Sequence, residues 1–164
     1  MSKRISFLGM LLGINQIMLF FSSIVPGNRL FFLGIASLPV ALVIIEFGLK
    51  SGILFYIGSA LLSLIIIFDK VYLIPYILFF GLYGVVKYLI EKDRNIVLEY
   101  ILKLISFNIL LMIGYFTVRY LIFTAVKMNV VVFILAQVVF LIYDYAYGLF
   151  ISYYYNKIQG KIGL

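Results

Sequence analysis

The sequence has no cysteine and no histidine, and only 12% of its residues are charged. These absences remove disulfides, thiolate nucleophiles, imidazole bases and the commonest ligands of zinc, copper and haem. Any acid–base chemistry would fall to six carboxylates, which do not pair on one helix face. We therefore expect no catalytic residue, no metal site and no cofactor, and a membrane enzyme ranks last among the function classes.

Apolar residues dominate what remains: 66% of the chain is hydrophobic and the mean hydropathy is +1.22. An ordinary soluble domain is ~25% charged and cannot hide so much apolar surface. With 164 residues and no polar block, we expect one transmembrane domain, 1–164, without a soluble head. The net charge of +7 comes from short basic clusters beside apolar spans. That pattern favours anionic lipid and topology signals over nucleic acid as a partner.

The stretch from Arg29 to Phe68 contains only three charged residues, Arg29, Glu46 and Lys50. As one helix it would be roughly 60 Å long, about twice the ~30 Å hydrocarbon core of a bilayer. The segment 46–52 combines two charges with two glycines, which allow backbone conformations that other residues resist. We therefore expect a transmembrane hairpin that turns within 46–52.

Six apolar segments are separated by short connections, so that neighbouring helices must be antiparallel. The predicted fold is all-α: a polytopic membrane protein, a bundle of six transmembrane helices with short loops. The predicted segments are Ile5 to Val25, Leu30 to Phe47, Gly52 to Phe68, Val71 to Leu89, Ile96 to Phe123, and Val130 to Tyr155.

The first segment is too long for a signal-peptide core and lacks a small-x-small cleavage site, so we expect a retained helix.

Basic residues predict the orientation, because Lys and Arg gather on the cytoplasmic side of membrane proteins. With both termini in the cytoplasm, nine basic residues lie inside and four outside, as expected for a multi-pass plasma-membrane protein. The inside set is Lys3, Arg4, Lys50, Lys87, Lys92, Arg94, Lys103, Lys157 and Lys161, and the outside set is Arg29, Lys70, Arg119 and Lys127.

Polar residues within the apolar segments are candidates for function, because ionised or strongly polar groups are costly in the membrane and often mark a pathway or a ligand. For Asp144 the sequence favours an ion pair with Lys50, Lys87 or Lys103 over a ligand. The intramembrane polar set is Asn15, Gln16, Asn108, Arg119, Gln137 and Asp144.

A substrate pocket is predicted near the outer surface, between residues 26–29 and the outer halves of the last three helices. Its wall would be Tyr76, Tyr115, Arg119 and Gln137, which combine aromatic faces with a few hydrogen-bonding groups at similar depth. The planar guanidinium of Arg119 would favour an anionic or carbonyl-bearing ligand. Contact of Arg119 with the outer headgroups is an equal alternative.

Gly9 and Gly13 form a small-xxx-small pair on the first helix. Such pairs allow two helix backbones to approach closely in lipid. Two readings stay open, internal helix packing and docking of a partner protein.

Six short-looped helices, the segment 38–52 and the segment 79–87, which reads FFGLYGVVK, together resemble the substrate-binding S components of energy-coupling factor (ECF) transporters. The resemblance implies capture of a vitamin-like micronutrient at the outer face. It also implies an ECF-type transmembrane coupling protein and cytoplasmic ATPases as partners. Gly9 and Gly13 would correspond to the family's docking motif, which is usually built from alanines. No phosphate-binding Walker motif is present, so ATP hydrolysis would come from a partner.

The competing expectation is a structural or scaffold membrane protein, similar to the small integral subunit of the bacterial rod-shape system. This reading needs no small-molecule substrate. Arg119 and Asp144 would then serve packing or partner contacts.

Overall fold

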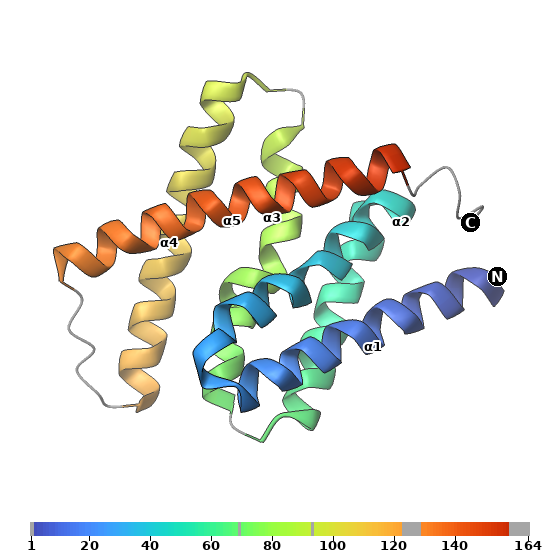
Figure 1. The fold of residues 1–164 in the computed structure, drawn as a ribbon, viewed down its shortest axis with the longest axis horizontal. Coiled ribbons are helices and arrows are strands. Elements are labelled where there is room, and N and C mark those ends of the chain that lie inside the picture. Colours follow the sequence, from blue (N-terminus) through green and yellow to red (C-terminus); the bar gives the residue numbers. More distant parts are fainter. Residues whose placement is uncertain (1, 69, 93, 123–128, 158–164) are drawn as a thin grey trace. The chain divides into compact units, whose positions relative to one another are not determined.

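The computed structural model describes residues 2–68, 70–92, 94–122 and 129–157, and its long elements are all helices (Figure 1). The all-α prediction is therefore confirmed for these ranges. In chain order the elements are α1 (Ser2–Ile24), the short 3-10 helix η1 (Pro26–Asn28), α2 (Arg29–Ile66), the 3-10 helix η2 (Lys70–Leu73), the π-helix η3 (Tyr76–Phe80), α3 (Gly81–Glu91), α4 (Ile96–Ile122) and α5 (Val130–Lys157).

Five stretches of the described chain are long and apolar enough to cross a membrane, which makes this a multi-pass membrane protein. The predicted count of six is not supported. The second and third predicted segments fall within the single element α2. The five stretches are Lys3–Ile24, Pro26–Ile66, Lys70–Glu91, Ile96–Tyr120 and Val130–Lys157.

Helix α2 is broken at Gly48, whose φ of 80° and ψ of 170° are not helical. A positive φ is readily adopted by glycine, which has no Cβ. Beyond this break the chain turns back, because Ala36 and Ser59 both accept hydrogen bonds from side chains of consecutive residues on α1. A straight helix would separate Ala36 and Ser59 by roughly 34 Å. The turn falls inside the predicted segment 46–52, and Figure 1 shows the two arms of α2, which we call the first arm (29–47) and the second arm (49–66).

The two arms pack tightly just beyond the turn. A Cβ added to Gly52 would overlap Cγ1 of Ile44, so this position accepts only glycine without a shift of the arms. Buried Ile44 forms a cluster with Val40 and with Val85 of α3. Ile53 of the second arm packs against this cluster, which joins both arms to α3. Charge and glycine content therefore locate the turn, and close packing of the arms holds it.

The predicted fourth helix is divided rather than continuous. A 3-10 turn, Lys70–Leu73, is followed by Pro75 and then by the π-helix Tyr76–Phe80, before regular helix resumes at Gly81. The Tyr56 hydroxyl of the second arm donates to the Ile77 carbonyl within the π-helix at 2.6 Å. A Cβ at Gly81 would lie 2.7 Å from the Tyr56 ring. The ring of Tyr56 therefore rests against the backbone where the π-helix ends.

The chain groups into two compact units, Met1–Arg94 and Asn95–Gly163. The N-terminal unit contains α1, α2 and α3 with the short turns between them, and the C-terminal unit contains α4 and α5. Each unit has its own polar contacts between helices, and these are described separately below.

Candidate functional site

Asn15 is the centre of a polar cluster inside the N-terminal unit. Its side chain is fully buried, although it lies near the middle of an apolar helix. Its Nδ2 donates to the Ala36 carbonyl at 2.6 Å and to the Tyr76 hydroxyl at 2.8 Å. Its Oδ1 accepts from Gln16 Nε2 at 3.0 Å. Asn15 therefore links α1 to the first arm of α2 and to the π-helix.

Ser59, on the second arm, completes the cluster and fixes the direction of its hydrogen bonds. The Ser59 hydroxyl donates to the Tyr56 carbonyl at 2.9 Å. It also lies 2.8 Å from the Tyr76 hydroxyl. Because the single Ser59 proton goes to Tyr56, Tyr76 must donate to Ser59 Oγ. Tyr76 in turn accepts from Asn15, so every proton in this chain of groups is assigned.

Gln16 is the fourth member of the polar cluster, which we define as Asn15, Gln16, Ser59 and Tyr76. Only 7% of Gln16 is exposed. Its Nε2 donates to Asn15 Oδ1 and to the Ser59 carbonyl, both at 3.0 Å. Its Oε1 is buried, and no described residue donates to it. Polar groups buried without a partner cost free energy, so this acceptor needs an explanation.

The cluster holds neutral groups only, two carboxamides and two hydroxyls. Its donors and acceptors satisfy one another across α1, both arms of α2 and the π-helix, apart from Gln16 Oε1. Without a carboxylate or an imidazole, this set can bind a polar molecule by hydrogen bonds. It has no strong base with which to transform that molecule.

An arginine–tyrosine stack lies at the end of the N-terminal unit that the sequence assigns to the outer face. The guanidinium carbon of Arg29 is 3.8 Å from the centre of the Tyr72 ring. Tyr72 precedes Tyr76 by four residues in the same segment. Polar and aromatic groups therefore run along this segment from its end to the cluster.

In the C-terminal unit, side-chain contacts between described residues join α4 and α5. Lys103 Nζ lies 3.1 Å from Asp144 Oδ2, with both side chains 6% exposed. The rings of Phe107 and Phe140 stack with centres 4.3 Å apart. Gln137 Nε2 donates to Asn108 Oδ1 at 2.9 Å. Residue numbers rise on α4 as they fall on α5, so the helices are antiparallel, and the predicted ion pair of Asp144 is confirmed with Lys103 as its partner.

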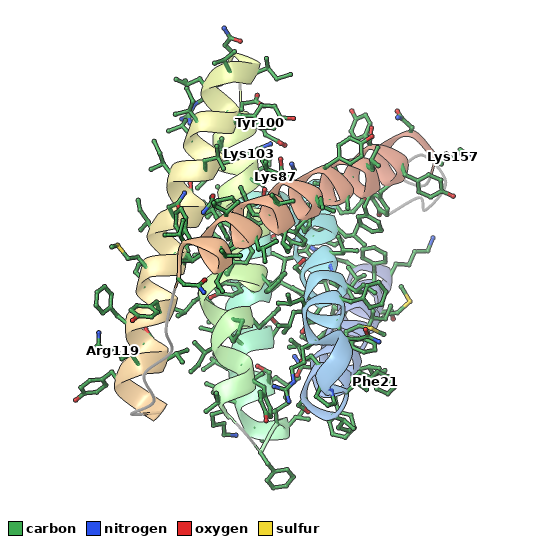
Figure 2. The ribbon with its side chains drawn as sticks, turned by 60° about the vertical axis from the view of Figure 1, so that its left-hand side comes forward. Phe21, Lys87, Tyr100, Lys103, Arg119 and Lys157 are labelled. Atoms are coloured by element: carbon green, nitrogen blue, oxygen red, sulfur yellow. The ribbon has the colours of Figure 1, made fainter. Side chains whose placement is uncertain are left out.

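The four residues predicted to bind substrate are divided between the units. Tyr76 belongs to the polar cluster of the N-terminal unit. Tyr115, Arg119 and Gln137 belong to the C-terminal unit, where Arg119 is exposed on α4 (Figure 2) and Gln137 bonds to Asn108. Tyr115 is half-buried and its ring meets that of Phe116 edge-on. A pocket formed by all four residues stays a prediction.

Gly9 and Gly13 are both exposed on α1. A Cβ added at either position would meet nothing within 4 Å. Within the N-terminal unit, no described residue packs closely against either glycine, in contrast to Gly52 and Gly81, and both readings of the pair stay predictions. We call this the open face of α1, because no described residue of the N-terminal unit covers it.

Sequence reasoning found members of the polar cluster but not the cluster. Asn15 and Gln16 belong to the predicted intramembrane polar set and Tyr76 to the predicted pocket, whereas Ser59 is in neither group. The contribution of Tyr56, through its hydroxyl and its carbonyl, was missed. The available signal for a buried cluster was the presence of hydroxyl groups within apolar segments, those of Tyr56, Ser59 and Tyr76.

The chain matches no family model, no curated protein and no solved structure. The class of protein therefore follows from the fold and the site alone. It is a multi-pass membrane protein, all-α over the residues that the structure describes, with a neutral polar cluster buried among its N-terminal helices.

Proposed function

We propose that this protein is the substrate-capturing membrane subunit of an ECF-type importer of a vitamin-like micronutrient. In this proposal it works with a transmembrane coupling protein and with cytoplasmic ATPases. The observation that carries the proposal is the polar cluster, buried at the middle of an apolar helix. Polar residues at membrane depth are expensive and commonly line substrate paths. The π-helix that supplies Tyr76 adds support, because π-helices are frequent at functional sites.

The arrangement of the cluster supports entry of substrate from the outer face. Tyr72, stacked against Arg29, lies one turn from Tyr76 along the same segment. A solute that reaches this stack would therefore meet Tyr76 and Asn15 next. In this reading the π-helix is the element along which the substrate enters.

The open face of α1 supports a partner protein in the membrane. A Cβ added at Gly9 or Gly13 meets no atom of the N-terminal unit within 4 Å. Small residues on a lipid-facing surface allow another helix to approach closely. We assign the coupling protein to the face that carries Gly9 and Gly13.

The membrane topology belongs to the same proposal. If each arm of α2 crosses separately, the chain crosses six times and both termini lie on the same side. The distribution of basic residues makes that side the cytoplasm. Half of the 38-residue helix α2 is roughly 28 Å long, close to the ~30 Å hydrocarbon core. The length of each arm is thus suited to one crossing.

A structural role is the second candidate, and a specific observation favours it. Most hydrogen bonds of the cluster are made among its own members and the neighbouring backbone. In the C-terminal unit, Lys103 and Asp144 pair with each other. Such internally satisfied contacts hold helices together in any membrane bundle and need no substrate.

Purification from native membranes distinguishes the two candidates. The importer predicts that the protein carries ATPases and a coupling protein with it, and that denaturation releases a small molecule. Gly13→Leu is the matched variant, expected to lose the protein partners and keep its fold. Purification of the unsubstituted protein with neither ATPases nor a small molecule would leave the structural candidate ahead.

A further inference from the structure

The carboxamide of Gln16 has a fixed orientation. Both contacts of its nitrogen are to oxygens, Asn15 Oδ1 and the Ser59 carbonyl, each at 3.0 Å. Turning the amide over would place Oε1 against these two acceptors and lose both hydrogen bonds. The oxygen of Gln16 therefore points away from Asn15 and Ser59.

No proton in the cluster is left over for that oxygen. Both donor positions of Asn15 are used, toward Ala36 and Tyr76. The Tyr76 proton goes to Ser59 and the Ser59 proton goes to Tyr56. The Tyr56 proton goes to the Ile77 carbonyl. Oε1 of Gln16, in a side chain that is 7% exposed, is thus an acceptor to which no described residue donates.

We infer that Gln16 Oε1 is a binding site for one O–H or N–H donor inside the N-terminal unit. The donor comes either from a water molecule or from a small neutral solute. A buried carboxamide oxygen loses its hydrogen bonds to water on folding, and a bound donor restores one of them. The adjoining Asn15, Ser59 and Tyr76 are locked by their own hydrogen bonds, so the site is rigid before anything binds.

The geometry also limits the chemical class. A carboxylate or a phosphate offers acceptors, and an acceptor set against Oε1 would be repelled. The cluster contains no carboxylate that would neutralise a buried cation. The site therefore selects a neutral donor, such as an alcohol, an amide N–H or water. This class differs from the anionic ligand that Arg119 would favour.

This inference does not depend on the proposed import function. A water molecule at Gln16 Oε1 would serve a structural membrane protein equally well. Loss of the proposed transport partners would leave the argument for this donor unchanged.

Infrared spectroscopy of the side-chain carbonyl tests the inference directly. The protein is produced with glutamine carrying ¹³C at the side-chain carbonyl and is placed in lipid bilayers. A difference spectrum against Gln16→Met isolates the Gln16 band, because methionine has similar bulk and no side-chain carbonyl. Gln137 provides the matched reference, since its Oε1 has a donor, Asn108, in the structure. If Gln16→Met does not fold, Gln137→Met combined with Gln159→Met leaves Gln16 as the labelled residue.

The expected result is a Gln16 band lowered in frequency, as for a hydrogen-bonded carbonyl. The spectrum is recorded on protein purified natively and on protein unfolded and refolded in buffer. A lowered band in both preparations supports the inference with water as the donor. A lowered band only in the native preparation supports it with a solute, which mass spectrometry of the released material then identifies. A band at the frequency of a free carbonyl in both preparations overturns it.

Discussion

Asn15 and Tyr76, 61 positions apart in the sequence, are joined by a hydrogen bond of 2.8 Å from Nδ2 to the phenolic oxygen. Both residues are fully buried. The bond holds α1 against the segment that follows Pro75, where the backbone has the wider π conformation. The bond satisfies one donor of Asn15 and one acceptor position of Tyr76, and leaving either group unpaired in this apolar environment would be costly.

Replacing Asn15 by leucine is expected to lower the free energy of unfolding by about 1–3 kcal/mol. The change removes three hydrogen bonds and takes the donor away from Tyr76. Unfolding in detergent mixtures of rising denaturing strength measures the effect. Ile14→Leu is the control, since Ile14 is 40% exposed on the same turn of α1. Equal stability of the two variants would contradict the importance given to the cluster.

The bond between Tyr76 and Ser59 is tested by a double-mutant cycle of Tyr76→Phe with Ser59→Ala. We expect a coupling energy of about 0.5–1.5 kcal/mol, because each single change removes the same hydrogen bond. The comparison cycle pairs Tyr76→Phe with Ser23→Ala, whose hydroxyl bonds the Phe20 carbonyl of its own helix. That second cycle should be additive. Equal coupling energies in both cycles would show that the coupling does not come from the hydrogen bond between Tyr76 and Ser59.

Glycine substitutions separate partner docking from packing. Gly13→Leu, and likewise Gly9→Leu, should leave unfolding unchanged and abolish assembly with the coupling protein, because bulk at an open face keeps a second helix away. Gly52→Ala should instead destabilise the fold by about 1–3 kcal/mol, since its Cβ would overlap Ile44. Unfolding assays and co-purification measure the two effects. Failure of Gly13→Leu to fold would remove the docking argument.

The sequence was a reliable guide where the signal is local or depends on depth. Glycine and charge around Gly48 predicted the turn in α2. Matching depths on two antiparallel helices allowed Lys103 as the partner of Asp144. The contact of Asn15 with Tyr76 was out of reach, because it depends on how far each helix rotates about its own axis. The π conformation after Pro75 was not predictable either, since proline is compatible with several ways of breaking a helix.

The helix count differs from the predicted six because α2, counted as one element, contains two arms. The non-helical Gly48 separates these arms, which correspond to the second and third predicted segments. Both descriptions agree on the place of the break. The C-terminal unit was easier to predict, with α4 and α5 beginning at the expected Ile96 and Val130.

Cysteine labelling tests the orientation without background, because the natural sequence has no cysteine. With cytoplasmic termini, Asn28→Cys should react with a membrane-impermeant thiol reagent added to intact cells, and Arg94→Cys should react only after lysis. Lys127, the second predicted outside position, lies outside the described residues and serves as an additional labelling site. Labelling of Arg94→Cys in intact cells, with Asn28→Cys protected, would reverse the orientation.

The ion pair of Lys103 and Asp144 is expected to show strong non-additivity. Asp144→Leu alone leaves a buried ammonium and Lys103→Met alone leaves a buried carboxylate, so each single variant should lose about 3 kcal/mol or more of stability. The double variant removes both charges and keeps apolar bulk, and it should be closer to the unsubstituted protein than either single variant. Unfolding of the four proteins under one condition gives the coupling. If the stability lost in the double variant equals the sum of the two single losses, the two charges act independently. The contact between α4 and α5 would then not offset the cost of burying these two charges in the membrane.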